Sequence, residues 1–157
     1  MKTYVVDFEE VLKNYINYHN SMKKIKAEKQ KFSDEIESIK KDMESIISAS
    51  KFIVDDRSQM EQASKFKELQ TKAIKLESEF RNDIVDLQNK ELEQNFSEIS
   101  SIVGIWATES EIDLIINKTQ TIFVSDKYDL TNSVLELLKE KNLFQEFSET
   151  EYLVESV

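Results

Sequence analysis

Apolar side chains recur in alternating steps of three and four residues over the stretch from residue 22 to residue 53. Lys29 and Ser50 occupy two positions of the series, and its apolar members are Met22, Ile25, Phe32, Ile36, Ile39, Met43, Ile46 and Ile53. Such spacing sustained over four heptads keeps one side of a helix apolar and is typical of a coiled coil. The length and the strict spacing favour this interpretation over an ordinary amphipathic helix.

A second apolar series follows a short polar cluster at residues 54–58, in which Asp56 or Ser58 is placed to cap a new helix. Its members are Phe66, Leu69, Ala73, Leu76, Phe80, Ile84 and Leu87, and it extends through Leu92, Phe96, Ile99, Val103 and Trp106. Two helices of similar repeat joined by a short turn predict an antiparallel hairpin. We therefore expect residues 22–103 to form an arm about 45–50 Å long, at 1.5 Å per residue.

The segments that flank this arm have a different pattern. Residues 4–6 form a short β-prone run, Asp7 can cap a helix over residues 8–18, and residues 17–21 form a polar break. After Gly104, the sequence predicts a strand at 111–117, a turn at 118–120, a second strand at 121–125 and a helix over 129–142. The predicted fold is mainly α with a small β part.

Three short strands cannot cover both edges of a sheet within one chain. The simplest solution is that several copies pool their strands around a rotational axis, and a homotrimer that closes a small barrel is the simplest case. We therefore expect residues 1–21 and 104–142 to form a trimerisation body. Residues 143–157 form an acidic tail, which is either a disordered extension or a docking peptide that uses Phe144, Phe147 and Tyr152.

Composition excludes several classes of protein. The 157 residues include one Gly and no Pro, which argues against the glycine-rich loops of nucleotide-binding folds. A net charge of −10 disfavours nucleic acid and anionic membrane surfaces as partners. The chain has no cysteine, so thiolate chemistry and Cys-based zinc sites are excluded.

The chain carries little that suggests catalysis. His19 is the only histidine, so a triad or a histidine-based metal site cannot be assembled, and we expect His19 to be a partly exposed residue at a helix end. Asp55 and Asp56 lack the further oxygen ligands of a calcium loop. The many carboxylates fall on polar helix faces, where pairing with lysines explains them. We expect no enzymatic activity, no cofactor and no metal.

Targeting signals are also absent from the sequence as given. Asp7, Glu9 and Glu10 interrupt the N-terminal segment, which has no apolar core of signal-peptide length. No segment reaches the roughly 18 consecutive apolar residues of a membrane span, so we expect no direct membrane insertion. The sequence as it stands predicts a cytoplasmic protein, and a periplasmic one if the chain is a mature form.

The two ends of the chain resemble the Skp/OmpH-like chaperone family. At the N-terminal end, Val5, Val6 and Asp7 precede Val11, Leu12 and Tyr15. At the C-terminal end, the motif consists of Ile112-Asp113-Leu114-Ile115-Ile116-Asn117, then Ile122-Phe123-Val124-Ser125, then Asp129-Leu130-Thr131 and Val134-Leu135. The resemblance covers about residues 3 to 142. The order of segments also distinguishes the chain from prefoldin, in which the β hairpins lie between the arm helices.

The resemblance implies a jellyfish-shaped homotrimer whose three arms enclose a cavity and hold unfolded outer-membrane proteins without ATP. Two features depart from the family pattern: the chain lacks a signal peptide, and it is acidic where family arms are commonly basic. Its densest basic stretch, residues 23–31, lies near the root of the predicted arm.

Two groups of apolar residues are candidates for contact with other chains. The first lies on the predicted arm and would contact clients or pack between arms; its members are Ile47, Phe52, Val54, Phe66 and Val85. The second belongs to the predicted trimer body and consists of Tyr4, Val6, Trp106, Leu114, Ile116, Phe123 and Val124.

The function favoured by these observations is an ATP-independent holdase chaperone for unfolded or unassembled, β-rich clients. The alternative is a cytosolic assembly or structural protein with the same fold, for which a phage-encoded helper of virion assembly is one candidate. The acidic charge and the missing export signal support that alternative. A plain coiled-coil adaptor, which would be a dimer, is the third interpretation.

Overall fold

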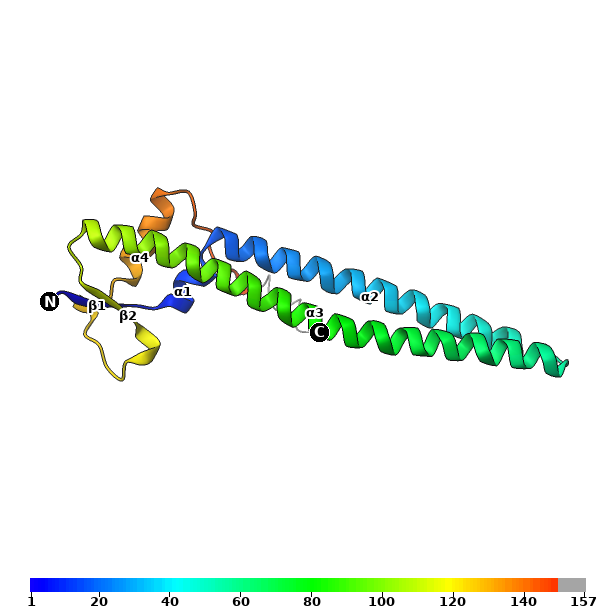
Figure 1. Ribbon diagram of the computed structural model, residues 1–157. Coiled ribbons are helices and arrows are strands. Elements are labelled where there is room, and N and C mark those ends of the chain that lie inside the picture. Colours follow the sequence, from blue (N-terminus) through cyan, green and yellow to red (C-terminus); the bar gives the residue numbers. More distant parts are fainter. Residues whose placement is uncertain (150–157) are drawn as a thin grey trace. The chain divides into compact units, whose positions relative to one another are not determined.

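The computed structural model describes residues 1–149, and these residues divide between two compact units. One unit contains Met1–Lys24 and the residues from Asn89 onward, and the other contains Ile25–Gln88. The elements, in chain order, are β1 (Thr3–Val6), α1 (Phe8–Lys13), α2 (Ile16–Ser50), α3 (Asp56–Glu109), β2 (Leu114–Asn117), the short 3-10 helices η1 (Lys118–Gln120) and η2 (Asp126–Tyr128), and α4 (Thr131–Glu140) (Figure 1). A long helical hairpin and a small parallel sheet confirm the predicted fold class.

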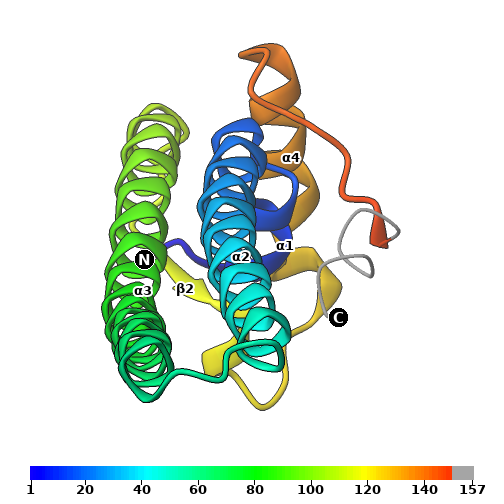
Figure 2. The ribbon, with the colours of Figure 1, turned by 90° about the vertical axis from the view of Figure 1, so that its right-hand side faces the viewer.

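The unit Ile25–Gln88 is an antiparallel helical hairpin, in which α2 and α3 lie side by side (Figures 1 and 2). Ile25 and Ile39 are buried, and the other apolar members of the two predicted series in this unit are half-buried. The rings of Phe32 and Phe80 stack across the hairpin with their centroids 4.0 Å apart. The predicted seam is therefore confirmed in this unit. Its helical segments run without interruption because no Gly or Pro falls within residues 25–88.

The turn of the hairpin lies at residues 51–55, three residues before the predicted cluster at 54–58, and its helix cap is Asp55 rather than Asp56 or Ser58. The Asp55 carboxylate accepts hydrogen bonds from the Ser58 backbone N–H at 3.0 Å and from the Ser58 hydroxyl at 2.8 Å. These bonds satisfy donors that the first turn of α3 cannot pair internally. They also hold the pKa of Asp55 below its ordinary value.

The other unit has a hydrophobic core built around the two strands. Its buried members come from β1, α1, the junction between α1 and α2, α3 and α4, and they are Val6, Val11, Leu12, Tyr15, Ile99, Val134 and Leu138. β1 and β2 pair in parallel, with Thr3 opposite Leu114 and Val6 opposite Asn117. On the other side of β1, the Leu130 N–H donates to the Val5 carbonyl at 2.8 Å. β1 therefore has neighbours on both sides.

Two expectations about the N-terminal segment are wrong. No polar break occurs at residues 17–21, because α1 already ends at Lys13 and α2 begins at Ile16. His19 is buried, with 3% of its surface exposed, and its Nε2 lies 2.7 Å from the Lys13 carbonyl oxygen. The early start of α2 places His19 in its first turn, next to the end of α1, rather than at an exposed helix end.

The predicted second strand at residues 121–125 does not form within one chain. It follows β2 through η1, and no strand is assigned to it. The outer side of β1 is already occupied by residues 129–130, and the segment does not pair with the other edge of β2 in its own chain. Ile122 and Phe123 are exposed as a result.

The apolar series predicted beyond Leu87 is wrong at several positions. Leu92 and Phe96 are about half exposed, whereas Glu91 and Asn95 are buried. Beyond Leu87 the buried residues of α3 are Glu91, Asn95 and Ile99, which are spaced four residues apart. The buried face of α3 therefore does not follow the predicted apolar series. Among residues 1–149, no helix is apolar enough over a sufficient length to cross a membrane.

Candidate functional site

The loop end of the hairpin displays a group of exposed apolar side chains. Phe52 and Val54 in the loop are 86% and 92% exposed, and Ile47 on the last turns of α2 is 48% exposed. These three were predicted as candidates for client contact. Met60 on α3 is 74% exposed and was missed. Its position outside the heptad spacing was the signal that could have identified it. We call Ile47, Phe52, Val54 and Met60 the tip group.

The remaining candidates on the hairpin have other surroundings. Val85 is half exposed and lies far along α3 from the tip group. Phe66 is half-buried and occupies a position of the predicted seam, so its side chain contributes to packing within the hairpin. Ile74, which was not predicted, is 64% exposed. Apolar surface is thus dispersed along α3 and denser at the loop.

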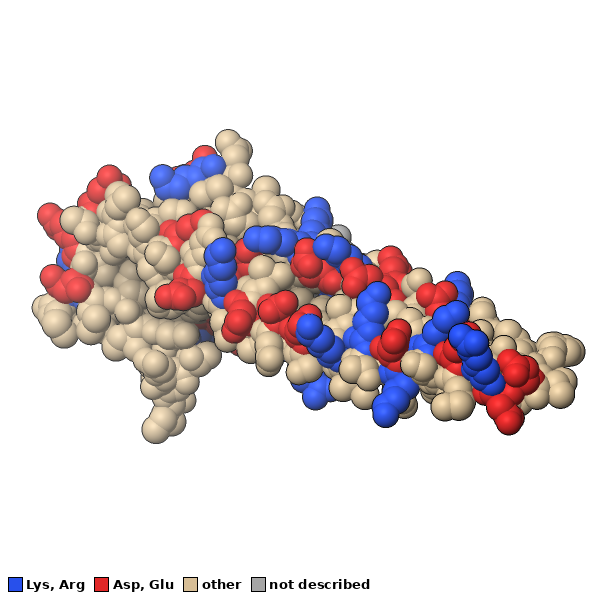
Figure 3. All heavy atoms as spheres, turned by 45° about the vertical axis from the view of Figure 1, so that its right-hand side comes forward, with Lys and Arg blue, Asp and Glu red and all other residues tan. Residues whose placement is uncertain are grey.

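Charged side chains of both signs surround this apolar surface along the helices (Figure 3). Several form pairs one turn apart, such as Lys41 with Glu37 at 3.5 Å and Arg81 with Glu77 at 2.8 Å. Exposed pairs of this kind add little stability. These charged side chains keep the helical surface well solvated, and single apolar side chains remain accessible between them.

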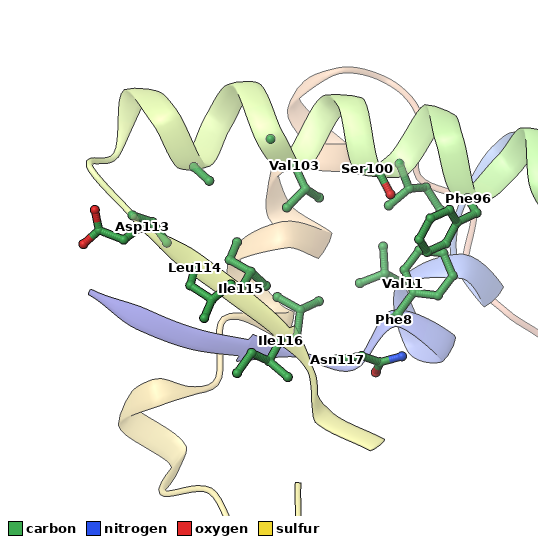
Figure 4. Close-up of a pocket in the computed structure, with 15 residues that line it drawn as sticks. Phe8, Val11, Phe96, Ser100, Val103, Asp113, Leu114, Ile115, Ile116 and Asn117 are labelled. Carbon is green, nitrogen blue, oxygen red and sulfur yellow. The ribbon is translucent and has the colours of Figure 1, made fainter. Parts of the chain in front are cut away.

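The unit that contains the sheet has an apolar groove of about 350 Å³ between α3 and β2 (Figure 4). Phe96 and Val103 line it from α3, and the Phe96 ring meets the Phe8 ring edge to face at 5.0 Å between centroids. The residues of β2 form another wall. In the described part of the chain, β2 pairs only with β1, so its other edge is unpaired. An unpaired edge beside an apolar groove is a surface suited to another strand.

The residues predicted for a trimer body fall into three classes. Val6 is in the core and Trp106 packs against it, so both support the fold of one chain. Phe123 and Leu114 are 84% and 43% exposed. The other three are partly buried, and they are Tyr4, Ile116 and Val124. Phe123, Leu114 and the neighbouring Ile122 therefore provide the apolar surface that remains available to a second copy.

A polar cluster between α2 and α3 was missed by the sequence analysis. The buried Glu91 carboxylate accepts from the Ser21 hydroxyl at 2.7 Å and from Lys24 Nζ at 2.6 Å, and Asn95 donates to Ser21 at 3.0 Å. The bonds from Lys24 and then Ser21 lower the pKa of Glu91 despite its burial. The cluster is fully hydrogen-bonded and supports the packing of α2 against α3.

Tyr15 forms a second polar connection in the same unit. Its hydroxyl donates to Glu98 Oε2 at 2.5 Å and accepts from Asn17 Nδ2 at 3.0 Å. Burial first, and the bond to Glu98 second, raise the pKa of Tyr15 to about 12. The same bond holds the pKa of Glu98 below its ordinary value. Tyr15 thus links the α1–α2 junction to α3.

Residues 1–149 contain no group of three or more His, Cys, Asp or Glu side chains arranged to hold a metal ion. The described surface also carries three apolar features: the tip group, the groove beside β2, and the exposed side chains of Ile122 and Phe123.

Comparison with models of protein families gives a match over most of the chain. The family model described as outer membrane protein (OmpH-like) matches residues 2–138. No curated protein matches the chain. The family match covers both the sheet-containing unit and the hairpin, and it ends before the tail.

Proposed function

The chain belongs to the OmpH-like family, whose members are non-enzymatic chaperones that bind unfolded proteins, and on this premise we propose that it is an ATP-independent holdase. In this proposal the helical hairpins of three copies enclose an unfolded or unassembled, β-rich client and keep it from aggregating.

The observation that carries the proposal is the tip group. Four large apolar side chains stand exposed together on a helical hairpin whose surface carries many charged side chains of both signs. Exposed apolar groups in one region of a soluble protein mark a site of contact with other molecules. Contacts of this kind are non-directional, which suits clients that share no sequence.

The sheet-containing unit supports the assembly of three copies. One chain leaves the β2 edge unpaired and exposes Ile122 and Phe123. If segment 121–125 of one copy added to the β2 edge of the next, the Ile122 and Phe123 side chains would be withdrawn from water. The pairing is head-to-tail, so a ring closed by rotation satisfies every copy.

A light-scattering assay with a chemically unfolded outer-membrane β-barrel protein tests the holding role. We expect a several-fold molar excess of the purified protein, without ATP, to suppress aggregation after the denaturant is diluted. The double substitution Phe52→Ser and Val54→Ser should raise the amount of protein required at least threefold, because it removes the two most exposed side chains of the tip group.

The matched control is Ile105→Ser, which replaces an apolar side chain that is 61% exposed but lies in the sheet-containing unit. We expect this variant to protect the client as well as the unchanged protein does. Equal loss in both variants would assign the effect to general surface polarity, and no protection by the unchanged protein would refute the holding role.

A further inference from the structure

Residues 143–149 follow the region matched by the family and lie against the junction between α1 and α2. Three hydrogen bonds fix them there: the Ile16 N–H donates to the Leu143 carbonyl at 2.8 Å, the Gln145 N–H to the Asn14 carbonyl at 2.9 Å, and the Phe147 N–H to the Asn14 side-chain oxygen at 2.9 Å. Phe144 and Tyr15 form an antiparallel bridge. The segment is thus bound largely as an added strand is bound, through its main chain.

Two aromatic side chains supplement these bonds. Phe144 packs against the core cluster, and Lys139 Nζ lies 4.8 Å from its ring centroid. The Phe147 ring has Lys13 Nζ 5.4 Å from its centroid. Cation–π contacts of this kind are favourable and select aromatic residues. The junction therefore recognises a leucine and two phenylalanines, spaced as Leu-Phe-x-x-Phe.

The junction also needs an external hydrogen-bond acceptor. The Tyr18 and His19 N–H groups donate to the Tyr15 carbonyl, whereas the Ile16 N–H, at the first position of α2, has no acceptor within the helix. The Leu143 carbonyl supplies that acceptor. The bound segment therefore caps the N-terminus of α2.

We propose that the α1–α2 junction, formed by Lys13, Asn14, Tyr15 and Ile16, is a docking site for an extended peptide of the form Leu-Phe-x-x-Phe. The occupant is the chain's own segment 143–149, which acts as a detachable clasp on the start of α2. The clasp is detachable because none of residues 143–149 is fully buried, whereas the core residue that precedes it, Leu138, has no exposed surface. This inference goes beyond the holding role and does not depend on it.

A peptide-exchange measurement on the full-length protein tests the docking site. The probe is a fluorescein-labelled synthetic peptide with the sequence of residues 142–149, Asn-Leu-Phe-Gln-Glu-Phe-Ser-Glu. In the unchanged protein the attached segment competes at a high effective concentration. We expect the double substitution Phe144→Ala and Phe147→Ala to lower the Kd of the probe at least tenfold, as measured by fluorescence anisotropy.

The control probe has both phenylalanines replaced by alanine and keeps the same charge. We expect it to bind neither protein. Equal binding of the two probes to the double variant would overturn the proposal, and so would equal binding of the phenylalanine probe to the variant and to the unchanged protein.

A second measurement avoids any effect of Phe144→Ala on the core. In the single variant Phe147→Ala, we expect the Ile16 amide to exchange with solvent deuterium at least five times faster than in the unchanged protein. The matched control is Glu146→Ala, an exposed position in the same segment, which should leave this rate unchanged. Unchanged Ile16 exchange in Phe147→Ala would refute the clasp. None of these readouts involves a client, so they are independent of the aggregation assay.

Discussion

Tyr15 contacts three parts of its unit, and no pattern in the sequence indicated these contacts. Its side chain is 2% exposed, its backbone bridges Phe144, and its hydroxyl bonds to Glu98 on α3. A buried tyrosine normally finds a partner for its hydroxyl, but the sequence does not show which residue that is. Glu98 lies 83 positions away, and only the return of α3 places it there.

This environment predicts how stability responds to alkaline pH. Folding raises the pKa of Tyr15 from 10.0 to about 12. The unfolded chain therefore loses the phenolic proton at a lower pH than the folded protein does, so stability is fully present below pH 10 and falls between pH 10 and 12. A shift of about two pKa units corresponds to roughly 2–3 kcal/mol.

The measurement is the free energy of unfolding by urea at pH 8 to 11.5, for the unchanged protein and for Tyr15→Phe. We expect Tyr15→Phe to be less stable at pH 8 by about 1–2 kcal/mol, because it loses the hydrogen bond, and to show a shallower alkaline decline. Tyr4→Phe, at a half-buried position, is the control and should retain the decline. Parallel curves for the unchanged protein and Tyr15→Phe would contradict the prediction.

The buried polar residues show why part of the site could not be predicted at the residue scale. Apolar residues at 92 and 96 continue a helical pattern, so the pattern assigns them to the inward face. In the structure Phe96 lines the groove beside β2, while Glu91 and Asn95 face α2. A helix that packs against different neighbours on two faces carries two overlapping apolar patterns. The sequence does not show which face packs against which neighbour.

At the scale of elements, local information was sufficient for the helices and insufficient for the strands. The heptad spacing, the absence of Pro and the presence of a single Gly, Gly104 near the end of α3, determine α2 and α3. The strand at 114–117 was recovered because its partner β1 lies in the same chain. Residues 121–125 have an equally β-prone composition but form no strand pairing within one chain. Strand formation depends on a partner, which composition does not supply.

The hairpin turn gives a prediction at this scale. Asp55 caps α3 through two bonds to Ser58, whereas Asp56 is the first residue of the helix and no cap bond is assigned to it. We expect Asp55→Ala to free the amides of the first turn of α3, so that the Ser58 amide exchanges with deuterium at least fivefold faster. Seam residues such as Ile39 should keep their protection.

Asp56→Ala is the matched control, since it removes a neighbouring carboxylate of equal charge and leaves the cap in place. We expect little change in the Ser58 exchange rate. If both variants accelerate exchange equally, the effect comes from the charge near the helix N-terminus and not from the cap.

At the scale of the whole molecule, the described surfaces suited to pairing with another copy lie in the sheet-containing unit. They are the free edge of β2, the groove beside it, and the exposed Ile122 and Phe123. The tip group lies in the other unit. Under the proposed function, surfaces for assembly and surfaces for clients are thus carried by different units, so substitutions can separate the two roles.

Assembly through residues 121–125 predicts that thermal stability depends on protein concentration. If unfolding is coupled to dissociation of a trimer, dilution favours the unfolded chains by mass action. For a chain of this length a tenfold dilution should lower Tm by about 3 °C. The measurement is calorimetry at three concentrations, with the mass determined by sedimentation equilibrium. We expect a mass near three chains and a Tm that falls on dilution for the unchanged protein. In the variant Ile122→Ser/Phe123→Ser, whose replaced side chains are exposed in one chain, the mass should fall to one chain and Tm should become independent of concentration. A monomeric unchanged protein would remove both the assembly and the enclosed cavity from the proposed function, because a single hairpin cannot surround a client.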